Sequence, residues 1–178
     1  MGKKFSPYVI YDNGGYGYIK SNLQKFNLAS SNFVYFILTD LDKHDCAPSL
    51  RTQWIPPYTY HENMIFRIAV REVEAWLLAD RLNFAKFLGI SNNLIPEFPE
   101  TLTDPKTTLI QLASKCKTRS IKEAIVPDPK TRAKQGPDYN GSLSHFVFQS
   151  WNIDIAKKNS LSLQRAITHL NKFQNVCS

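Results

Sequence analysis

The stretch FVYFILTDLDKHD, from Phe33 to Asp45, joins an apolar run to two carboxylates that are one residue apart. The residues from Phe33 to Thr39 carry almost no polar side chain, as a central parallel strand requires, because helices cover both of its faces. Asp40 and Asp42 follow at the predicted end of this strand. Ligands of open α/β sheets bind outside the carboxyl ends of strands, so a functional site is expected here.

The Asp-x-Asp pair has two interpretations. Two carboxylates with nothing basic between them repel each other, and a bound cation would relieve that repulsion. Asp40 and Asp42 would then be metal ligands, and the adjacent His44 could serve as an acid or base. The alternative is a solvated acidic loop in which aspartates cap a helix. The pattern alone leaves both interpretations open.

Strands and helices alternate in the first half of the chain. Tyr8–Tyr11 reads as a strand, Tyr18–Phe26 as a helix and Met64–Val70 as a further strand. Strand, helix, strand is the order of a parallel sheet. Arg71–Ile90 then reads as one helix that ends at Gly89.

The second half is predicted to be helical. Asp104 or Thr103 begins a helix with Pro105 in its first turn, and Ser160 caps the last helix. Between them, the proline-containing segment 126–139 reads as an exposed loop. Further helices are expected over Ser142–Trp151, Asp154–Lys158 and Leu161–Phe173. The predicted fold is therefore a single α/β domain over residues 1–178, with a small, mostly parallel sheet flanked by helices in a core of about 1–90 and a helical C-terminal portion of about 100–178.

Composition restricts the class of protein. The chain has 178 residues, of which 43% are hydrophobic and 21% charged, as is ordinary for a globular domain. No apolar run approaches the roughly 18 residues of a membrane span, and the N-terminus has no signal-peptide pattern, so we expect a cytoplasmic protein. The three cysteines form no Cys-x-x-Cys pair, which disfavours a zinc site or a disulfide framework.

The charge of the chain points to a polyanionic partner. The formal net charge is +7, and basic residues are concentrated between Lys106 and Lys134. Such a segment could follow the phosphates of a nucleic acid, although a solvated basic face without a partner is the alternative. The residues proposed to bind nucleic acid are Lys115, Lys117, Arg119, Lys122, Lys130, Arg132 and Lys134.

A second acidic pair, Glu72 and Glu74, follows the predicted strand Met64–Val70. In a parallel sheet these acids would lie at the same edge as Asp40 and Asp42. Alternatively, acids in a first helical turn favour the helix dipole and serve stability alone.

The block EVEAWLLAD (Glu72–Asp80), together with Asp-x-Asp and the DPK segment at Asp104–Lys106, resembles an uncharacterised Toprim-like bacterial family. The resemblance covers most of the chain. Toprim domains occur in topoisomerases, bacterial primases and the nuclease half of overcoming-lysogenization-defect proteins. Smaller members of this kind are often encoded beside an ATPase, in contexts that suggest defence against phage or plasmids.

The resemblance implies metal-dependent phosphodiester chemistry. By position, Asp40 and Asp42 would bind Mg²⁺ or Mn²⁺, and Glu72 and Glu74 would be further ligands or a base. Lys43 would neutralise the scissile phosphate, or it is a surface lysine. The family's first-strand glutamate has no counterpart here, where VIYDNGGYG offers Asp12 or Asn13 instead. Asp12 is the candidate for an additional metal ligand.

The leading functional hypothesis is accordingly a Toprim-like, Mg²⁺- or Mn²⁺-dependent nuclease. The second is a non-catalytic nucleic-acid-binding or regulatory subunit that acts with an ATPase partner. A small-molecule phosphotransferase is a third. The sequence offers neither a Walker loop nor a complete GxGxxG motif, so we expect no ATP hydrolysis by this chain.

Overall fold

The computed structural model describes residues 9–10, 14–55 and 60–176, and the chain divides into two compact units. Unit 1 comprises Met1–Ile68 and Arg165–Ser178, and unit 2 comprises Ala69–Gln164. The division falls after Ile68. The sequence, in contrast, predicts that the α/β core ends near residue 90 and that a helical portion follows. That the whole chain is a single domain stays a prediction.

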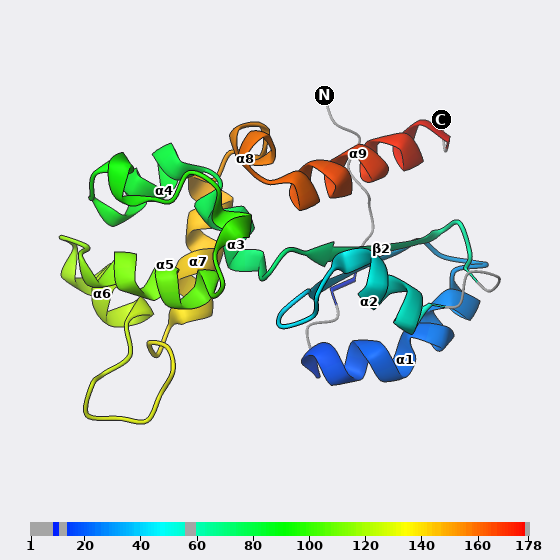
Figure 1. The fold of residues 1–178 in the computed structure, drawn as a ribbon, viewed down its shortest axis with the longest axis horizontal. Helices are drawn as coiled ribbons and strands as arrows, with labels where there is room; N and C mark the ends of the chain where they lie inside the picture. Colours follow the sequence, from blue (N-terminus) through cyan, green and yellow to red (C-terminus); the bar gives the residue numbers. More distant parts are fainter. Residues whose placement is uncertain (1–8, 11–13, 56–59, 177–178) are drawn as a thin grey trace. The chain divides into compact units, whose positions relative to one another are not determined.

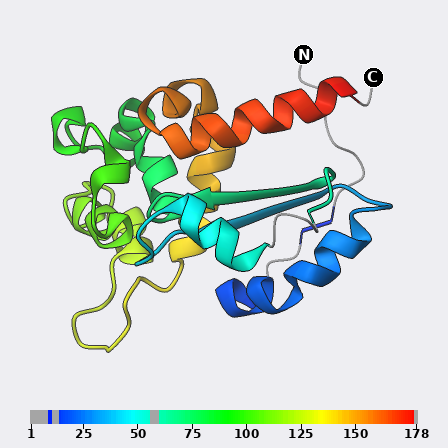
Figure 2. The same cartoon turned by 45° about the vertical axis from the view of Figure 1, so that its right-hand side comes forward.

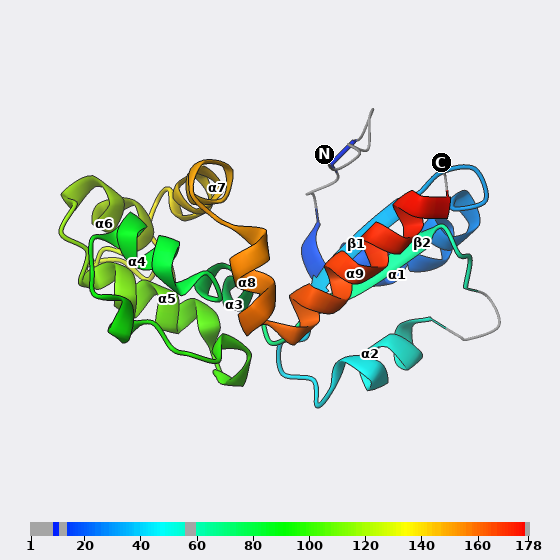
Figure 3. The ribbon, with the colours of Figure 1, turned by 90° about the horizontal axis from the view of Figure 1, so that it is seen from above.

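Unit 1 contains the sheet. Its elements are α1 (Gly15–Ala29), β1 (Tyr35–Asp40), α2 (Ala47–Trp54), β2 (Met64–Ala69) and, from Arg165 onward, α9 (Leu161–Val176). In the described residues β1 and β2 pair as a two-stranded parallel sheet, and the N–H of Tyr35 donates to the carbonyl of Asn63 (3.0 Å) where the strands begin. Figures 2 and 3 show the two strands side by side. The mixed α/β class expected from the sequence is therefore confirmed. Of the strand expected over Tyr8–Tyr11, only Val9 and Ile10 lie within the described residues.

The two strands differ in burial. Five of the six residues of β2 are buried, which is the pattern of a strand covered on both faces, and Trp54 of α2 stacks on Phe66 with ring centroids 5.7 Å apart. In β1 only Ile37 and Thr39 are buried, while Phe36 is 44% exposed. The expectation that β1 is covered on both faces is therefore wrong within the described residues, because one of its faces is covered only in part.

Unit 2 is helical, as Figure 1 shows for α3 to α8. Its core is aromatic and aliphatic: Phe84 and Phe146 are fully buried and meet edge to face at 5.1 Å. Two short 3-10 turns, Asn92–Leu94 and Pro99–Thr101, connect the helices. The helices are α3 (Val73–Leu78), α4 (Arg81–Leu88), α5 (Pro105–Ser114), α6 (Arg119–Ile125), α7 (Tyr139–Gln149) and α8 (Ile153–Asn159).

The prediction of one helix over Arg71–Ile90 is wrong, because the chain leaves the helical conformation at Asp80. This residue has φ −87° and ψ 65°, and its carboxylate accepts hydrogen bonds from the backbone N–H (3.4 Å) and the side-chain amide (2.8 Å) of Asn83. Asp80 thus acts as the N-cap of α4 and separates α4 from α3. The predicted end is confirmed, since Gly89 has φ 64° and closes α4 in the left-handed conformation.

The predicted starts of α5 and α9 are confirmed, whereas α1 begins at Gly15 and not at Tyr18. Asp104 caps α5 by accepting from the N–H of Thr107 (2.6 Å), and Ser160 accepts from the N–H of Leu163 (3.2 Å) at the start of α9. α7 begins earlier than expected, at Tyr139. α6 was not predicted, and the loop that follows it, residues 126–138, has no helix or strand, as expected.

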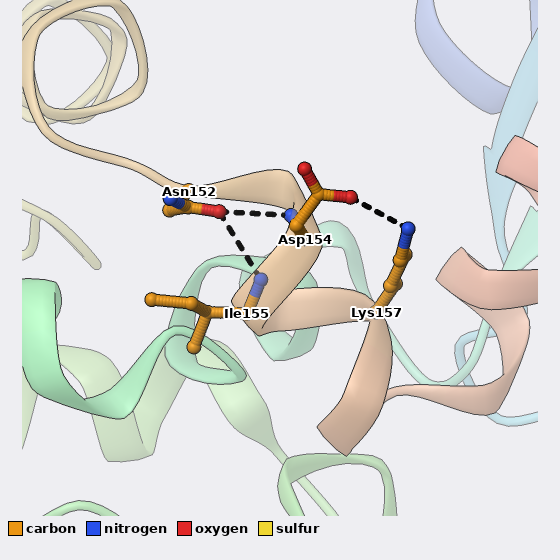
Figure 4. A network of polar contacts seen from close by, with 4 residues as sticks. All are labelled: Asn152, Asp154, Ile155 and Lys157. Carbon is orange, nitrogen blue, oxygen red and sulfur yellow. Dashed lines mark hydrogen bonds and ion pairs between the residues drawn. The ribbon is translucent and has the colours of Figure 1, made fainter.

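The start of α8 is defined by a polar network (Figure 4). The side-chain oxygen of Asn152 accepts hydrogen bonds from the N–H groups of Asp154 (2.9 Å) and Ile155 (3.2 Å). Lys157 forms an ion pair with Asp154, with Nζ 2.6 Å from Oδ1. The ammonium group holds the pKa of the Asp154 carboxyl below its usual range through this hydrogen bond and its charge. Asn152 therefore sets the first turn of α8.

A helix that crosses a membrane must be both long and apolar. Over residues 9–10, 14–55 and 60–176, none is both long and apolar enough to cross a bilayer.

Candidate functional site

The Asp-x-Asp acids lie at the carboxyl end of β1. Asp40 is the last residue of the strand and is half-buried, whereas Asp42 is exposed. Between them, Leu41 is only 2% exposed and anchors the segment in the core of unit 1. The buried leucine therefore separates the half-buried Asp40 from the exposed Asp42.

Asp42 has φ 50°, the one positive value among the described residues other than glycine. This left-handed conformation is tolerated by Asp and Asn far better than by other residues with a side chain. The turn is closed by a hydrogen bond from the N–H of His44 to the carbonyl of Leu41 (3.1 Å). The backbone at Asp42 therefore restricts which residues can replace it.

The loop that carries Asp42 is fastened to α1 and α2. The hydroxyl of Tyr16, in the first turn of α1, lies 2.8 Å from Nε2 of His44, and the two rings are stacked at 6.1 Å. Trp54 of α2 meets Tyr16 edge to face at 4.7 Å. Lys43 is exposed in the same loop. These contacts orient His44, although its predicted role as an acid or base stays a prediction.

Glu72 and Glu74 have structural hydrogen bonds in unit 2. Glu74 is only 7% exposed, and its Oε1 accepts from the hydroxyl of Tyr139 (2.8 Å). Glu72 is half-buried and accepts from the backbone N–H of Lys106 (2.8 Å), in the first turn of α5. Since Asp104 accepts from the next N–H along the chain, two carboxylates satisfy the amino end of α5 and favour its dipole.

Tyr139 connects this acidic group to α7. The residue is 2% exposed, and burial, followed by the charge and hydrogen bond of Glu74, raises the pKa of its hydroxyl well above the ordinary value. The charges of Glu72 and Asp104 act in the same direction. The Nζ of Lys106 lies 4.8 Å from the centre of the Tyr139 ring, in a cation–π contact. The hydroxyl therefore stays protonated and serves as the donor to Glu74.

Tyr139 is not among the functional residues that the sequence predicts. It stands 65 residues from Glu74, and no local pattern links the two. An aromatic residue with a hydroxyl at the start of a helix is not by itself a signal for a buried carboxylate partner. Only the packing of α7 within unit 2 reveals the contact.

The acids that the sequence grouped at one sheet edge belong to different units: Asp40 and Asp42 lie in unit 1, Glu72 and Glu74 in unit 2. That they form one site stays a prediction. Asp12 lies outside the described residues. Across the part of the chain that the structure describes, no group of three or more His, Cys, Asp or Glu side chains is placed to hold a metal ion together.

The Asp-x-Asp segment nevertheless fits a hard divalent ion in its donor chemistry. Asp40 and Asp42 offer carboxylate oxygens from the end of a strand, one half-buried and one exposed. Mg²⁺ in proteins is usually held by one or two carboxylates, with water and substrate phosphates as the remaining ligands. Two carboxylates from this segment match the number that such a site usually takes from the protein.

The basic residues proposed to bind nucleic acid are all exposed. Arg119 and Lys122 lie on α6, and Arg119 pairs with Glu123 at 2.7 Å. This hydrogen bond and the Glu123 charge raise the pKa of the Arg119 guanidinium. The remaining residues lie before α6, at Lys115 and Lys117, and in the loop after it, at Lys130, Arg132 and Lys134.

Comparison with known proteins gives no relative: no protein-family model, curated protein or solved structure matches this chain.

Proposed function

We propose that this chain is a Toprim-like nuclease that depends on Mg²⁺ or Mn²⁺, with Asp40 and Asp42 as the metal ligands. The observation that carries the proposal is the position of Asp40 at the carboxyl end of a parallel strand, followed by the exposed Asp42. The exposed basic residues of unit 2 support a nucleic acid as the substrate. A role in defence against phage or plasmids belongs to the same proposal.

The other acids have a different place in the proposal. Glu72 and Glu74 already accept hydrogen bonds from Lys106 and Tyr139. These bonds favour a positioning role for the two glutamates over direct metal binding. Asp12 stays a proposed additional ligand.

The chemistry follows from the proposed ligands. A divalent ion, when bound, activates water and stabilises the oxygens of an in-line displacement at phosphorus. The carboxylates of Asp40 and Asp42 hold negative oxygens at the strand end, and the exposed ammonium of Lys43 attracts the phosphate of the substrate. His44 follows Lys43 in the sequence, and Tyr16 orients its side chain. His44 is the candidate acid or base.

Cleavage assays with Asp40→Asn and Asp42→Asn test the proposal. Purified protein is incubated with single- and double-stranded DNA and RNA, with Mn²⁺, Mg²⁺ or a chelator. We expect metal-dependent cutting that falls at least about 100-fold in either variant, because each change removes a charged ligand. Asn at position 42 keeps the left-handed backbone, so the loss is not a folding effect.

The matched control is Asp45→Asn, which removes the same charge from an exposed position in the same loop. Its cutting rate should stay within about twofold of the wild type, as expected for an exposed charge that is not a ligand. Cutting that survives both Asp40→Asn and Asp42→Asn would refute the assignment of the ligands. A lack of metal-dependent cutting on all four substrates would refute the nuclease itself.

A second candidate function is a non-catalytic nucleic-acid-binding or regulatory subunit that acts with an ATPase partner. It is favoured by the run of exposed cations at Lys130, Arg132 and Lys134 in a loop without helix or strand. Replacing these three by Gln should weaken DNA or RNA binding and reduce its salt dependence, because each phosphate contact releases counterions. Binding lost in this variant, without cutting by the wild type, would establish this function in place of the first.

A further inference from the structure

The loop between α6 and α7, residues 126–138, projects from the helices of unit 2 (Figures 1 and 2). Its middle part, residues 128–134, is exposed at every position. This part carries the three cations Lys130, Arg132 and Lys134, and Asp128 is its one carboxylate. An exposed surface with this charge attracts a polyanion.

The two ends of the loop are fastened to α6. The N–H of Gly136 donates to the carbonyl of Ile125 (2.8 Å), and the N–H of Asp138 donates to the carbonyl of Ala124 (3.1 Å). Gly136 is buried, and a Cβ atom at this position would clash with the carbonyl oxygen of Ala124. Glycine alone permits so close an approach of two backbone segments. The loop therefore leaves α6 and returns to it at one fixed place.

Asp128 folds the exposed part of the loop. Its Oδ1 accepts a hydrogen bond from the N–H of Lys130 (2.9 Å), and its carbonyl accepts from the N–H (2.9 Å) and the hydroxyl (2.9 Å) of Thr131. The hydroxyl oxygen of Thr131 accepts in turn from the N–H of Ala133 (3.3 Å). These local bonds give the loop a defined turn before any partner binds. Binding then costs less conformational entropy than it would for a flexible loop.

The side chains of the loop favour a double-stranded nucleic acid over a single strand. Proteins that bind single strands stack the bases on aromatic side chains, and residues 126–138 include no aromatic residue. A duplex presents its phosphates on the outside, where lysine and arginine contact them without reading the sequence. Exposed cations without aromatic neighbours match the outside of a duplex.

We propose that residues 128–134 form a preorganised contact with the phosphates of a double-stranded nucleic acid, and that Asp128 is the positioning residue of this contact. The inference deepens the proposed function and rests on its choice of a nucleic acid as the substrate. A carboxylate repels phosphate, so its presence among three cations needs a reason. The reason is that its oxygen holds the turn at Lys130.

Two variants at position 128 separate the positioning effect from the effect of charge. Asp128→Asn and Asp128→Ala both remove one negative charge, but only Asn keeps a side-chain oxygen that accepts from the N–H of Lys130. Binding of a labelled DNA duplex is measured by fluorescence anisotropy, with a chelator present so that no metal-dependent cutting occurs. Asp128→Asn should bind at least as tightly as the wild type, and Asp128→Ala should bind at least about threefold more weakly than Asp128→Asn. Equal affinities of the two variants would overturn the positioning role.

The contact of the cations with phosphate is tested by Arg132→Gln. This variant should bind the duplex about fivefold more weakly, and the slope of log affinity against log salt should fall by about 0.9. Lys86→Gln is the matched control, because it removes one positive charge from an exposed position on α4 of the same unit. Its affinity should stay within about twofold of the wild type. If Lys86→Gln weakens binding as much as Arg132→Gln, the effect is one of general charge and the proposal is overturned.

Titration with a single strand of the same sequence tests the form of the nucleic acid. The duplex should bind at least about fivefold more tightly, because its phosphates are more densely spaced. Tighter binding of the single strand would overturn the assignment to a duplex, and so would a lack of binding to either form.

Failure of this inference can be told apart from failure of the proposed nuclease. Duplex binding that Arg132→Gln weakens, without metal-dependent cutting by the wild type, would refute the nuclease and leave the loop contact standing. Metal-dependent cutting of a duplex that Arg132→Gln binds and cuts as the wild type does would overturn the loop contact and leave the nuclease standing.

Discussion

The buried carboxylates of unit 2 and the carboxylates at the end of β1 in unit 1 have different surroundings. In unit 2, Asp80 is completely buried and Glu74 nearly so, and both accept hydrogen bonds from the protein. At the end of β1 in unit 1, Asp40 is half-buried and Asp42 is exposed. A buried carboxylate must be satisfied by donors, whereas an exposed one is solvated and can exchange water for a ligand. Buried carboxylates therefore stabilise the helical unit by accepting hydrogen bonds, whereas Asp42 of the sheet unit stands at the surface of the protein.

The strongest test of this comparison is a pair of isosteric changes, Asp80→Asn and Asp42→Asn. The carboxylate of Asp80 accepts from the side-chain amide of Asn83 (2.8 Å) and the backbone N–H of Asn152 (2.7 Å). In Asp80→Asn the charge-assisted hydrogen bonds are lost, and the new NH₂ group faces an N–H donor of the protein. The free energy of unfolding should therefore fall by about 3 kcal/mol.

Urea denaturation measures both variants. Asp42→Asn should leave the free energy of unfolding unchanged within about 0.5 kcal/mol, because the position is exposed and Asn tolerates its backbone. Equal losses in the two variants would contradict the contrast between the units.

A smaller effect is expected from Tyr139→Phe, which removes the donor to buried Glu74. The free energy of unfolding should fall by roughly 1–3 kcal/mol, the cost of a buried acceptor without its partner. Tyr18→Phe, at a position 41% exposed, is the control and should have little effect. Both are measured by urea denaturation near neutral pH. A neutral result for Tyr139→Phe would mean that Glu74 is stabilised by other groups.

The same variant has a distinct dependence on pH. The pKa of Tyr139 is raised in the folded protein above its ordinary value of 10.0, so above that pH the unfolded chain releases a proton that the folded chain retains. The free energy of unfolding should therefore fall as pH rises above about 10, by up to about 1.4 kcal/mol per pH unit from this residue. Tyr139→Phe should lose that contribution. An identical alkaline slope in wild type and variant would contradict the assignment.

The smallest effect in this series is expected from Asn152→Ala. The change removes the side-chain oxygen that accepts two N–H groups at the start of α8 but keeps the backbone N–H that donates to Asp80. Loss of an N-cap typically costs about 1 kcal/mol. Asn152→Asp keeps a capping oxygen and should be close to the wild type in urea denaturation. If Ala and Asp variants are equally unstable, the cap is not the cause.

Local patterns predicted the elements that depend on local physics. β2 follows from an apolar run that Arg67 alone interrupts, and the starts of α5 and α9 follow from Asp104 and Ser160 as capping residues. The break at Asp80 had a signal of the same kind, an aspartate three residues before Asn83, but the apolar periodicity around it favoured one continuous helix. The chain therefore follows the capping signal of Asp80 and not the apolar periodicity, because hydrogen-bond donors surround the Asp80 carboxylate.

The contacts of the candidate site could not be predicted in the same way. Glu72 was expected at the edge of the sheet, yet it accepts from Lys106, which is 34 residues away. Glu74 meets Tyr139 across a still longer separation. Such partners depend on how helices pack, and no periodicity in the sequence encodes them. The positions of Asp40 and Asp42 were predictable only as those of residues at the end of a strand.

The hydroxyl of Tyr60 bears on how β2 can pair with a further strand. The carbonyl of Met64 and the N–H of Phe66, which it contacts, alternate with the groups that pair β2 to β1, and so point away from the sheet. These are the groups that an extended segment of another molecule would use to add itself as a strand. Within the described residues, the phenol of Tyr60 therefore takes up one acceptor and one donor through which a further strand could pair with β2.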